Sequence, residues 1–211
     1  MNTLRKTYIN EIISWNKKLN LTGLKDAEEI GSKLYDDSLN IAGALDLGGA
    51  IKVIDVGCGA GFPGIPLKIE YPSIQLTLID SIGKKIEFVK HAIKLLDLKD
   101  TSAICARAEE LGREKDFREQ YDLAVSRAVA KLNTLCEYCL PFVRIGGLFV
   151  AQKGPDIEEE ISAADRAIKQ LGGAFKEKIS VASGFLVVIE KKKPTPVDFP
   201  RKTGVPSKDP L

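Results

Sequence analysis

The amino-acid sequence predicts an α/β fold with a seven-stranded, mostly parallel sheet that ends in an antiparallel hairpin, preceded by a small helical cap. Two observations lead to this fold class. From residue 51 onward, apolar runs typical of buried strands alternate with helical patterns, and the usual right-handed crossovers make such strands parallel. The last two strand patterns are joined only by Ser183 and Gly184, and so short a connection requires an antiparallel pair.

Composition limits the class of protein. With 211 residues, 44% hydrophobic and 28% charged, the chain suits one α/β domain with a small appendage. No apolar run approaches the ~18 residues of a membrane-spanning helix, and the polar N-terminus lacks the apolar region of a signal peptide. We therefore expect a cytoplasmic monomer with no membrane partner.

The cysteines indicate no metal site. All four, Cys58, Cys105, Cys136 and Cys139, fall in or beside predicted buried elements, which suits reduced thiols. The spacing of Cys136 and Cys139 is compatible with zinc or redox chemistry. However, the two cysteines lie three residues apart in a helical pattern and share an apolar face, and His91 is the one histidine of the chain.

Each element has its own pattern. Apolar residues at helical spacing predict a first helix ending near Asn20, and a second helical stripe begins at the capping pair Asp26 and Glu29 and continues to about Leu45. Strands are expected at 51–56, 75–80, 102–106, 121–126, 147–152, 175–182 and 185–191, with helices near 63–71, 83–96, 109–119, 130–140 and 156–171. The domains expected are a helical cap (1–48), an α/β domain (49–193) and a tail (194–211).

The stretch from Lys52 to Gly64 predicts a buried strand, a tight glycine turn and a helix. Glycines suit such a turn because they reach positive φ and let the backbone approach a ligand held at the helix N-terminus. Gly59 to Gly64 alone fits the dinucleotide pattern G-x-G-x-x-G, whereas Gly57, Gly59 and Gly61 with Asp55 upstream fit a turn for S-adenosylmethionine (SAM) better. A turn that only packs helix against sheet is the third interpretation.

Ligands of open parallel sheets bind beyond the carboxyl ends of the strands, so the residues there are site candidates. Asp80 ends the second strand and can accept hydrogen bonds from ribose hydroxyls, as in NAD and SAM sites, or cap the following helix. After the third strand, the Ala108 N–H and the Glu109 carboxylate can read an adenine edge, although acids are common in a helix's first turn. The terminal hairpin favours SAM, because it is typical of class I SAM-dependent methyltransferases and unusual in NAD-binding domains.

The fourth strand leads into Ser126-Arg127-Ala128 and contains no Asn/Asp-Pro-Pro-aromatic motif, which methyltransferases acting on exocyclic amines usually carry. Guanine N7 has a lone pair and no proton, so its methylation requires positioning and no general base. We therefore assign no catalytic residue. Arg127 can orient the methionine carboxylate of SAM or face guanine O6 and N7, unless it is an ordinary surface or salt-bridged arginine.

The tail from Lys191 to Leu211 contains five of the ten prolines and carries six basic against two acidic side chains. This composition is typical of an extended, basic terminus. It predicts either a solvated end without a role or an arm that binds RNA.

These motifs together resemble the bacterial small-subunit ribosomal RNA guanine-N7 methyltransferases of the glucose-inhibited division protein B family. The resemblance covers nearly the whole chain and rests on the segments 15–22, 37–39, 55–64, 80–85, 107–109, 126–128, 153–154 and 200–206. It implies SAM contacts at Gly57, Phe62, Ala108, Glu109 and Arg127. Three departures from the family pattern are Cys58, where serine is frequent, a shortened segment before Ile51, and Tyr35-Asp36, where a histidine is more usual.

We thus predict a SAM-dependent enzyme that methylates N7 of a guanine in 16S ribosomal RNA, free or in the small subunit. Its cofactor-binding residues are expected to be Gly57, Gly59, Phe62, Asp80, Ala108, Glu109 and Arg127. The first helices and the tail are expected to hold RNA. The alternatives are an NAD-linked oxidoreductase and a non-catalytic RNA-binding assembly factor.

Overall fold

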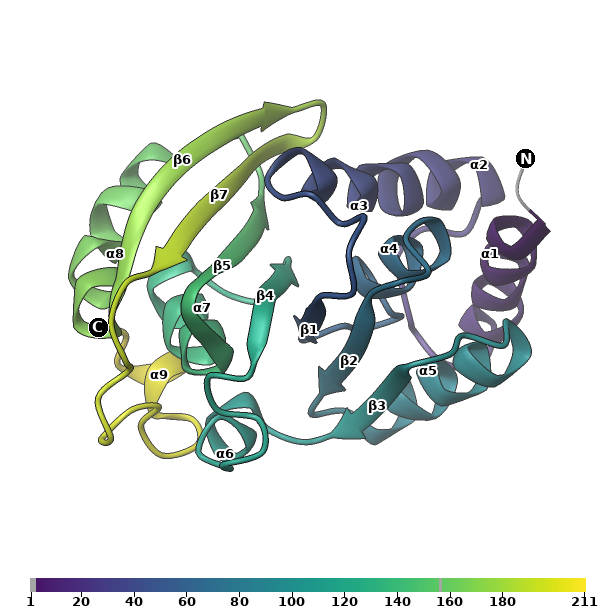
Figure 1. The fold of residues 1–211 in the computed structure, drawn as a ribbon. Helices are drawn as coiled ribbons and strands as arrows, with labels where there is room; N and C mark the ends of the chain where they lie inside the picture. The colour runs from purple at the N-terminus through teal and green to yellow at the C-terminus, as the bar shows by residue number, and fades with distance from the viewer. Residues whose placement is uncertain (1–2, 156) are drawn as a thin grey trace.

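A computed structural model gives the fold of residues 3–155 and 157–211. One seven-stranded sheet runs through the molecule in the order β3-β2-β1-β4-β5-β7-β6 (Figure 1). Strands β1 to β5 pair in parallel, and β7 is antiparallel to both β5 and β6. The predicted sheet and its terminal hairpin are therefore confirmed.

The elements follow the predicted alternation. The strands are β1 (Lys52–Val56), β2 (Gln75–Asp80), β3 (Thr101–Cys105), β4 (Tyr121–Arg127), β5 (Val143–Lys153), β6 (Gly173–Val181) and β7 (Gly184–Lys191). The α-helices are α1 (Thr3–Asn16), α2 (Ala27–Ile30), α3 (Asp37–Leu39), α4 (Gly64–Glu70), α5 (Gly83–Leu95), α6 (Ala108–Leu111), α7 (Leu132–Cys139), α8 (Glu158–Gln170) and α9 (Val205–Lys208). The other helical turns are η1 (Gly31–Asp36), η2 (Asn40–Gly43) and η3 (Leu140–Phe142). The expected start of α8 at 156 lies outside the described residues.

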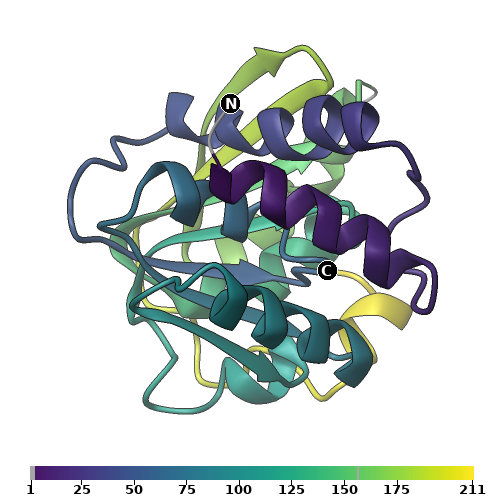
Figure 2. The same cartoon turned by 90° about the vertical axis from the view of Figure 1, so that its right-hand side faces the viewer.

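Two apolar cores cover the two faces of the sheet. Val53 and Ile54 of β1 are both fully buried but belong to different cores, because successive side chains of a strand point to opposite faces. One core packs the sheet against α1, α4, α5 and the cap, and the other packs it against α7 and α8 (Figures 1 and 2). Cys136 and Cys139 of α7 are buried in the second core, whereas Cys105 is exposed.

The cap differs from the prediction at the end of its first helix. α1 ends at Asn16, four residues early, because the Asn16 side chain replaces the helical hydrogen bonds. Its Oδ1 accepts from the N–H groups of Leu21 and Thr22, and its Nδ2 donates to the carbonyls of Thr22 and Leu24. Asp26 caps the next helix as predicted, accepting from two backbone N–H groups. Residues 17–24 therefore form a loop held by one side chain.

The helix predicted at 109–119 is also wrong, because α6 ends at Leu111. Turns follow as far as Glu119, whose φ of 55° is left-handed. In this segment the guanidinium of Arg118 donates hydrogen bonds to the carbonyls of Thr195 and Phe199 in the tail. The segment after α6 thus packs against a tail about 80 residues away, a contact that helical periodicity cannot reveal.

The tail does not form the extended, solvated end that its composition indicates. Thr195, Phe199 and Pro206 are buried, and the segment packs against α6 and α7 and forms the short helix α9 near its end (Figure 1, yellow). Among the described residues, no helix is both long and apolar enough to span a bilayer.

Candidate cofactor site

The glycine turn after β1 depends on conformations that favour glycine. Gly57, Gly59 and Gly61 have φ values of 76°, 57° and 94°, in the left-handed region. A Cβ on Gly57 would lie 2.5 Å from a methyl carbon of Val129, whereas one on Gly59 would meet nothing within 4 Å. The backbone at Gly59 thus faces open space, as a ligand-binding turn requires. From the cap, Tyr8 Oη donates to the Ala60 carbonyl at 2.6 Å and fixes the turn.

Asp80 connects the ends of β1 and β2. Its Oδ2 accepts from Gly59 N at 3.0 Å and its Oδ1 from Ile82 N at 2.9 Å. The N-cap position of α5 is taken by Ile82, so the alternative role of Asp80 as that helix's cap is not observed. The side chain is 7% exposed and borders the cleft described below. It therefore fixes the glycine turn and presents a carboxylate to the cleft.

Asp55 is a second carboxylate at this turn, and it is completely buried. Its Oδ2 accepts from Gly64 N at 2.8 Å, while its Oδ1 is buried without a hydrogen-bond partner. Burial raises the pKa of Asp55 to about 7; the Gly64 N–H opposes this shift, and the charge of Asp80 adds to it. The turn is thus built around a carboxyl group whose charge is costly.

Ala108 and Glu109 begin α6, just after β3. Glu109 is only 4% exposed, and its Oε1 accepts from Gly204 N of the tail at 2.9 Å. Sequence reasoning located Glu109 but missed this partner, because Gly204 lies 95 positions away. Both α6 residues border the same cleft as the glycine turn.

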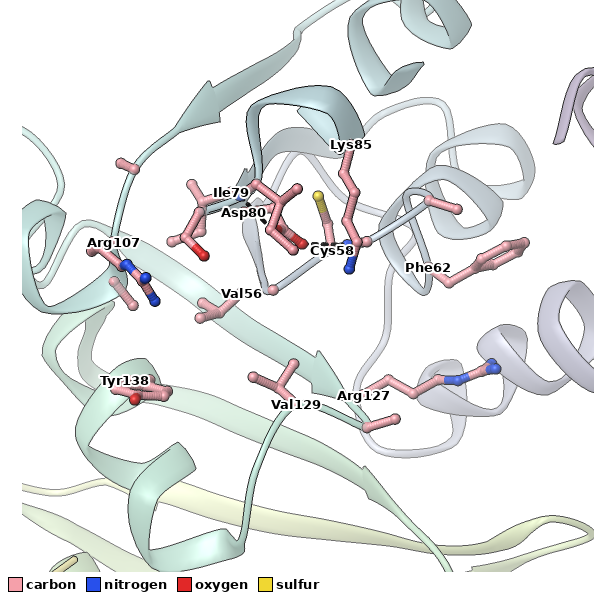
Figure 3. Close-up of a pocket in the computed structure, with 18 of the residues that line it drawn as sticks. Val56, Cys58, Phe62, Ile79, Asp80, Lys85, Arg107, Arg127, Val129 and Tyr138 are labelled. Carbon is pink, nitrogen blue, oxygen red and sulfur yellow. Dashed lines mark hydrogen bonds between the residues drawn. The ribbon is translucent and has the colours of Figure 1, made fainter. Parts of the chain in front are cut away.

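Arg127 ends β4 and turns toward the cap. Its Nη1 lies 3.3 Å from the Leu34 carbonyl and 3.5 Å from Asp37 Oδ2. The guanidinium carbon lies 5.9 Å from the centre of the Phe62 ring, within cation–π range (Figure 3). Arg127 is mostly buried, and burial lowers its pKa, whereas the carboxylates of Asp37 and Asp55 act in the opposite direction. Arg127 is therefore not a surface arginine, although its ion pair with Asp37 matches the salt-bridged alternative.

All seven predicted cofactor residues line one cleft of about 430 Å³ at the carboxyl ends of β1 to β4. The lining also includes residues that the sequence reasoning did not select, notably Lys85, Arg107, Val129 and Tyr138 (Figure 3). Tyr138 lies on α7, where its neighbours suggest only a core helix. The described residues contain no group of three or more side chains suited to a metal ion.

The fold is that of a class I SAM-dependent methyltransferase. Strand β7 is reversed in the sheet, and a glycine turn and a carboxylate lie at the ends of the adjacent strands β1 and β2. Solved structures share this fold at low identity. A mutant of MtNAS in complex with S-adenosylmethionine matches with a TM-score of 0.61 and 15% identity, covering 90% of this chain and 72% of that chain. The ribosomal protein L11 methylase of Lactobacillus delbrueckii subsp. bulgaricus matches with a TM-score of 0.58 and 16% identity, covering 74% and 77%.

The chain belongs to the GidB family, described as rRNA small subunit methyltransferase G, which matches residues 1–184. Among similar proteins, the ribosomal RNA small subunit methyltransferase G of Alkaliphilus metalliredigens is 48% identical over 211 residues, covering 97% of this chain and 88% of that protein. The protein of the same name from Moorella thermoacetica is 46% identical over 212 residues, covering 98% and 88%. The resemblance inferred from the motifs is thereby confirmed.

Proposed function

We propose that this protein transfers a methyl group from SAM to N7 of a guanine in 16S ribosomal RNA. The observation that carries the proposal is the convergence of the seven candidate residues, from four segments of the sequence, on one cleft. The relatives' shared name supports a substrate in the small-subunit RNA. The fold supports SAM over NAD, since β7 forms the reversed strand of class I methyltransferases.

The residues of the cleft fit SAM. The open space at Gly59 leaves room for a ligand against the backbone, and Asp80 offers acceptors for ribose hydroxyls. We assign the adenine end to Ala108 and Glu109. The glycine turn and Phe62 then hold the methionine end, and Arg127 lies where this end meets the cap.

When bound, SAM supplies an electrophilic methyl group. Guanine N7 attacks with its lone pair and carries no proton, so the protein needs to orient the two partners and keep water out. Arg127 can donate to a carboxylate or to guanine O6 with its planar fork. Its contacts to Leu34 and Asp37 hold that fork beside Phe62, which supports a role at the transfer end of the cleft.

For the RNA, we propose the loop at 17–24 as a contact surface. Leu21 and Thr22 of this loop line the cleft, and the Asn16 hydrogen bonds hold its backbone. Lys17 and Lys18 are exposed and form no ion pair with any residue that the structure describes. Their charges are thus available to phosphates of RNA that contacts this loop.

Equilibrium dialysis with labelled SAM and labelled NAD tests the cofactor, and SAM alone is expected to bind. Methyl transfer is then measured on free 16S RNA and on small subunits from cells that lack the enzyme. Reverse-transcription stops after chemical cleavage at 7-methylguanine map the modified base. Binding of NAD would favour the oxidoreductase. SAM binding without transfer to either substrate would favour an assembly factor.

A further inference from the structure

The tail is anchored to the domain where it leaves the sheet. Lys191, at the end of β7, is completely buried, and its Nζ donates to the Leu140 carbonyl and to Thr195 Oγ1, each at 2.6 Å. Thr195 N donates to Glu119 Oε1 at 2.7 Å, and the Arg118 guanidinium donates to the Thr195 carbonyl at 2.7 Å. These hydrogen bonds therefore fix the backbone path at the start of the tail, from Lys191 to Thr195.

The next fixed point is an ion pair between Arg201 and Glu137. Glu137 belongs to α7 and is 1% exposed. Arg201 Nε donates to its Oε1 at 3.0 Å and Nη2 to its Oε2 at 2.7 Å, while the backbone N–H of Arg201 donates to Oε1 at 2.7 Å. This bidentate pair fixes both the side chain and the backbone of Arg201.

Directly after Arg201, the tail reaches α6, whose Glu109 lines the cleft. Thr203 Oγ1 donates to Glu110 Oε1 at 2.9 Å, and Gly204 N donates to Glu109 Oε1 at the same distance. Gly204 has a φ of 83°, a left-handed conformation that glycine readily adopts. No other hydrogen bond to the Glu109 carboxylate is found within residues 3–155 and 157–211, so its Oε2 is the oxygen left for a ligand.

We propose that the turn at 201–204 positions Glu109 to accept a hydrogen bond from the exocyclic amine of the cofactor's adenine. This inference rests on the proposed SAM site. The Gly204 N–H holds one oxygen of the Glu109 carboxylate, so the side chain cannot rotate freely. A carboxylate with one orientation distinguishes a donor from an acceptor on the ligand better than a mobile one does. Arg201 and Glu137 act through Gly204 and touch no ligand, so they are positioning residues.

The test compares S-adenosylhomocysteine with S-inosylhomocysteine, which carries a carbonyl oxygen in place of the amine. An oxygen facing the Glu109 carboxylate offers no donor, so the unchanged protein should bind the adenosyl compound at least about 10-fold more tightly. Arg201→Met removes the bidentate pair, and its discrimination should fall to about threefold or less. Lys202→Met is the matched control, because Lys202 is exposed and its side chain makes no hydrogen bond or ion pair with the described residues, and it should discriminate as the parent does.

Two milder variants keep the test informative if Arg201→Met folds poorly. Arg201→Lys retains the charge without the planar fork and should lose part of the discrimination. Thr203→Val removes only the bond to Glu110 and should show a smaller loss. Michaelis constants for the RNA should stay unchanged in both.

Three results would contradict either the positioning role of the turn at 201–204 or the proposed function. Full discrimination in a folded Arg201→Met protein refutes the positioning role. Equal loss of affinity for both compounds in Arg201→Met also refutes it, because general damage to the cleft does not distinguish the amine of one compound from the carbonyl of the other. If the unchanged protein does not bind S-adenosylhomocysteine at all, the proposed function itself fails.

Discussion

Replacing Asp55 with asparagine should stabilise the protein, and more so at high pH. Asp55 is completely buried, and one of its oxygens has no partner. Burial raises its pKa from 3.8 to about 7 in the folded state. Because the folded pKa lies above the unfolded value, the protonated form favours folding below about pH 4. This stability is lost as the pH rises through 7.

The magnitude follows from the size of the shift. Each pKa unit corresponds to about 1.4 kcal/mol, so a rise to about 7 costs the folded state about 4 kcal/mol at pH 8 and about 1.5 kcal/mol at pH 5. Asparagine carries no charge at either pH and keeps an acceptor for Gly64 N–H. The free energy of unfolding of Asp55→Asn minus that of the parent should therefore increase by about 2–3 kcal/mol from pH 5 to pH 8.

Urea unfolding of both proteins at the two pH values measures this difference directly. Asp46→Asn is the control. Asp46 also accepts one backbone N–H, from Gly48, but it is exposed. Its difference from the parent should stay constant within error. A difference for Asp55→Asn that does not change with pH would show that the carboxylate is already ionised at pH 5, or that water reaches it.

Three further predictions concern the cleft and the loop at 17–24. Asp80→Ala should weaken SAM binding about 10- to 100-fold in equilibrium dialysis, since it removes a charged acceptor and the partner of Gly59 N; an unchanged dissociation constant would limit Asp80 to a structural role. Arg127→Lys should lower the methyl-transfer rate while the melting temperature holds, because lysine lacks the planar fork, and normal turnover would remove Arg127 from the site. Lys17→Ala with Lys18→Ala should flatten the slope of log RNA affinity against log salt by roughly 1.4, with SAM affinity as the control; an unchanged slope would locate the RNA elsewhere.

The expected role of the tail is revised by its packing. Truncation after Lys193 would remove the expected RNA arm, but it would also remove the partners of Arg118 and Glu137 and the donor to Glu109. A loss of activity on truncation would therefore report on the fold and the cleft as well as on RNA. Point changes at exposed tail residues such as Lys202 separate the two effects.

The sequence alone determined the sheet, the glycine turn and which residues line the cleft, because each of these depends on local patterns. Alternating apolar runs predict parallel strands, and a two-residue connection predicts the hairpin. Since the carboxyl ends of parallel strands meet at one edge, Gly57, Asp80, Glu109 and Arg127 could be expected together, and all four line the same cleft.

Only the tertiary structure decided which groups these side chains contact. Arg127 reaches Asp37 across 90 positions, Glu109 is held by Gly204 across 95, and Arg118 donates to the Phe199 carbonyl across 81. None of these contacts leaves a periodicity in the sequence, because each needs a single polar group at the right place in a distant segment. Composition therefore described the tail as a free basic end, whereas its buried polar contacts bind it to the edge of the cofactor cleft.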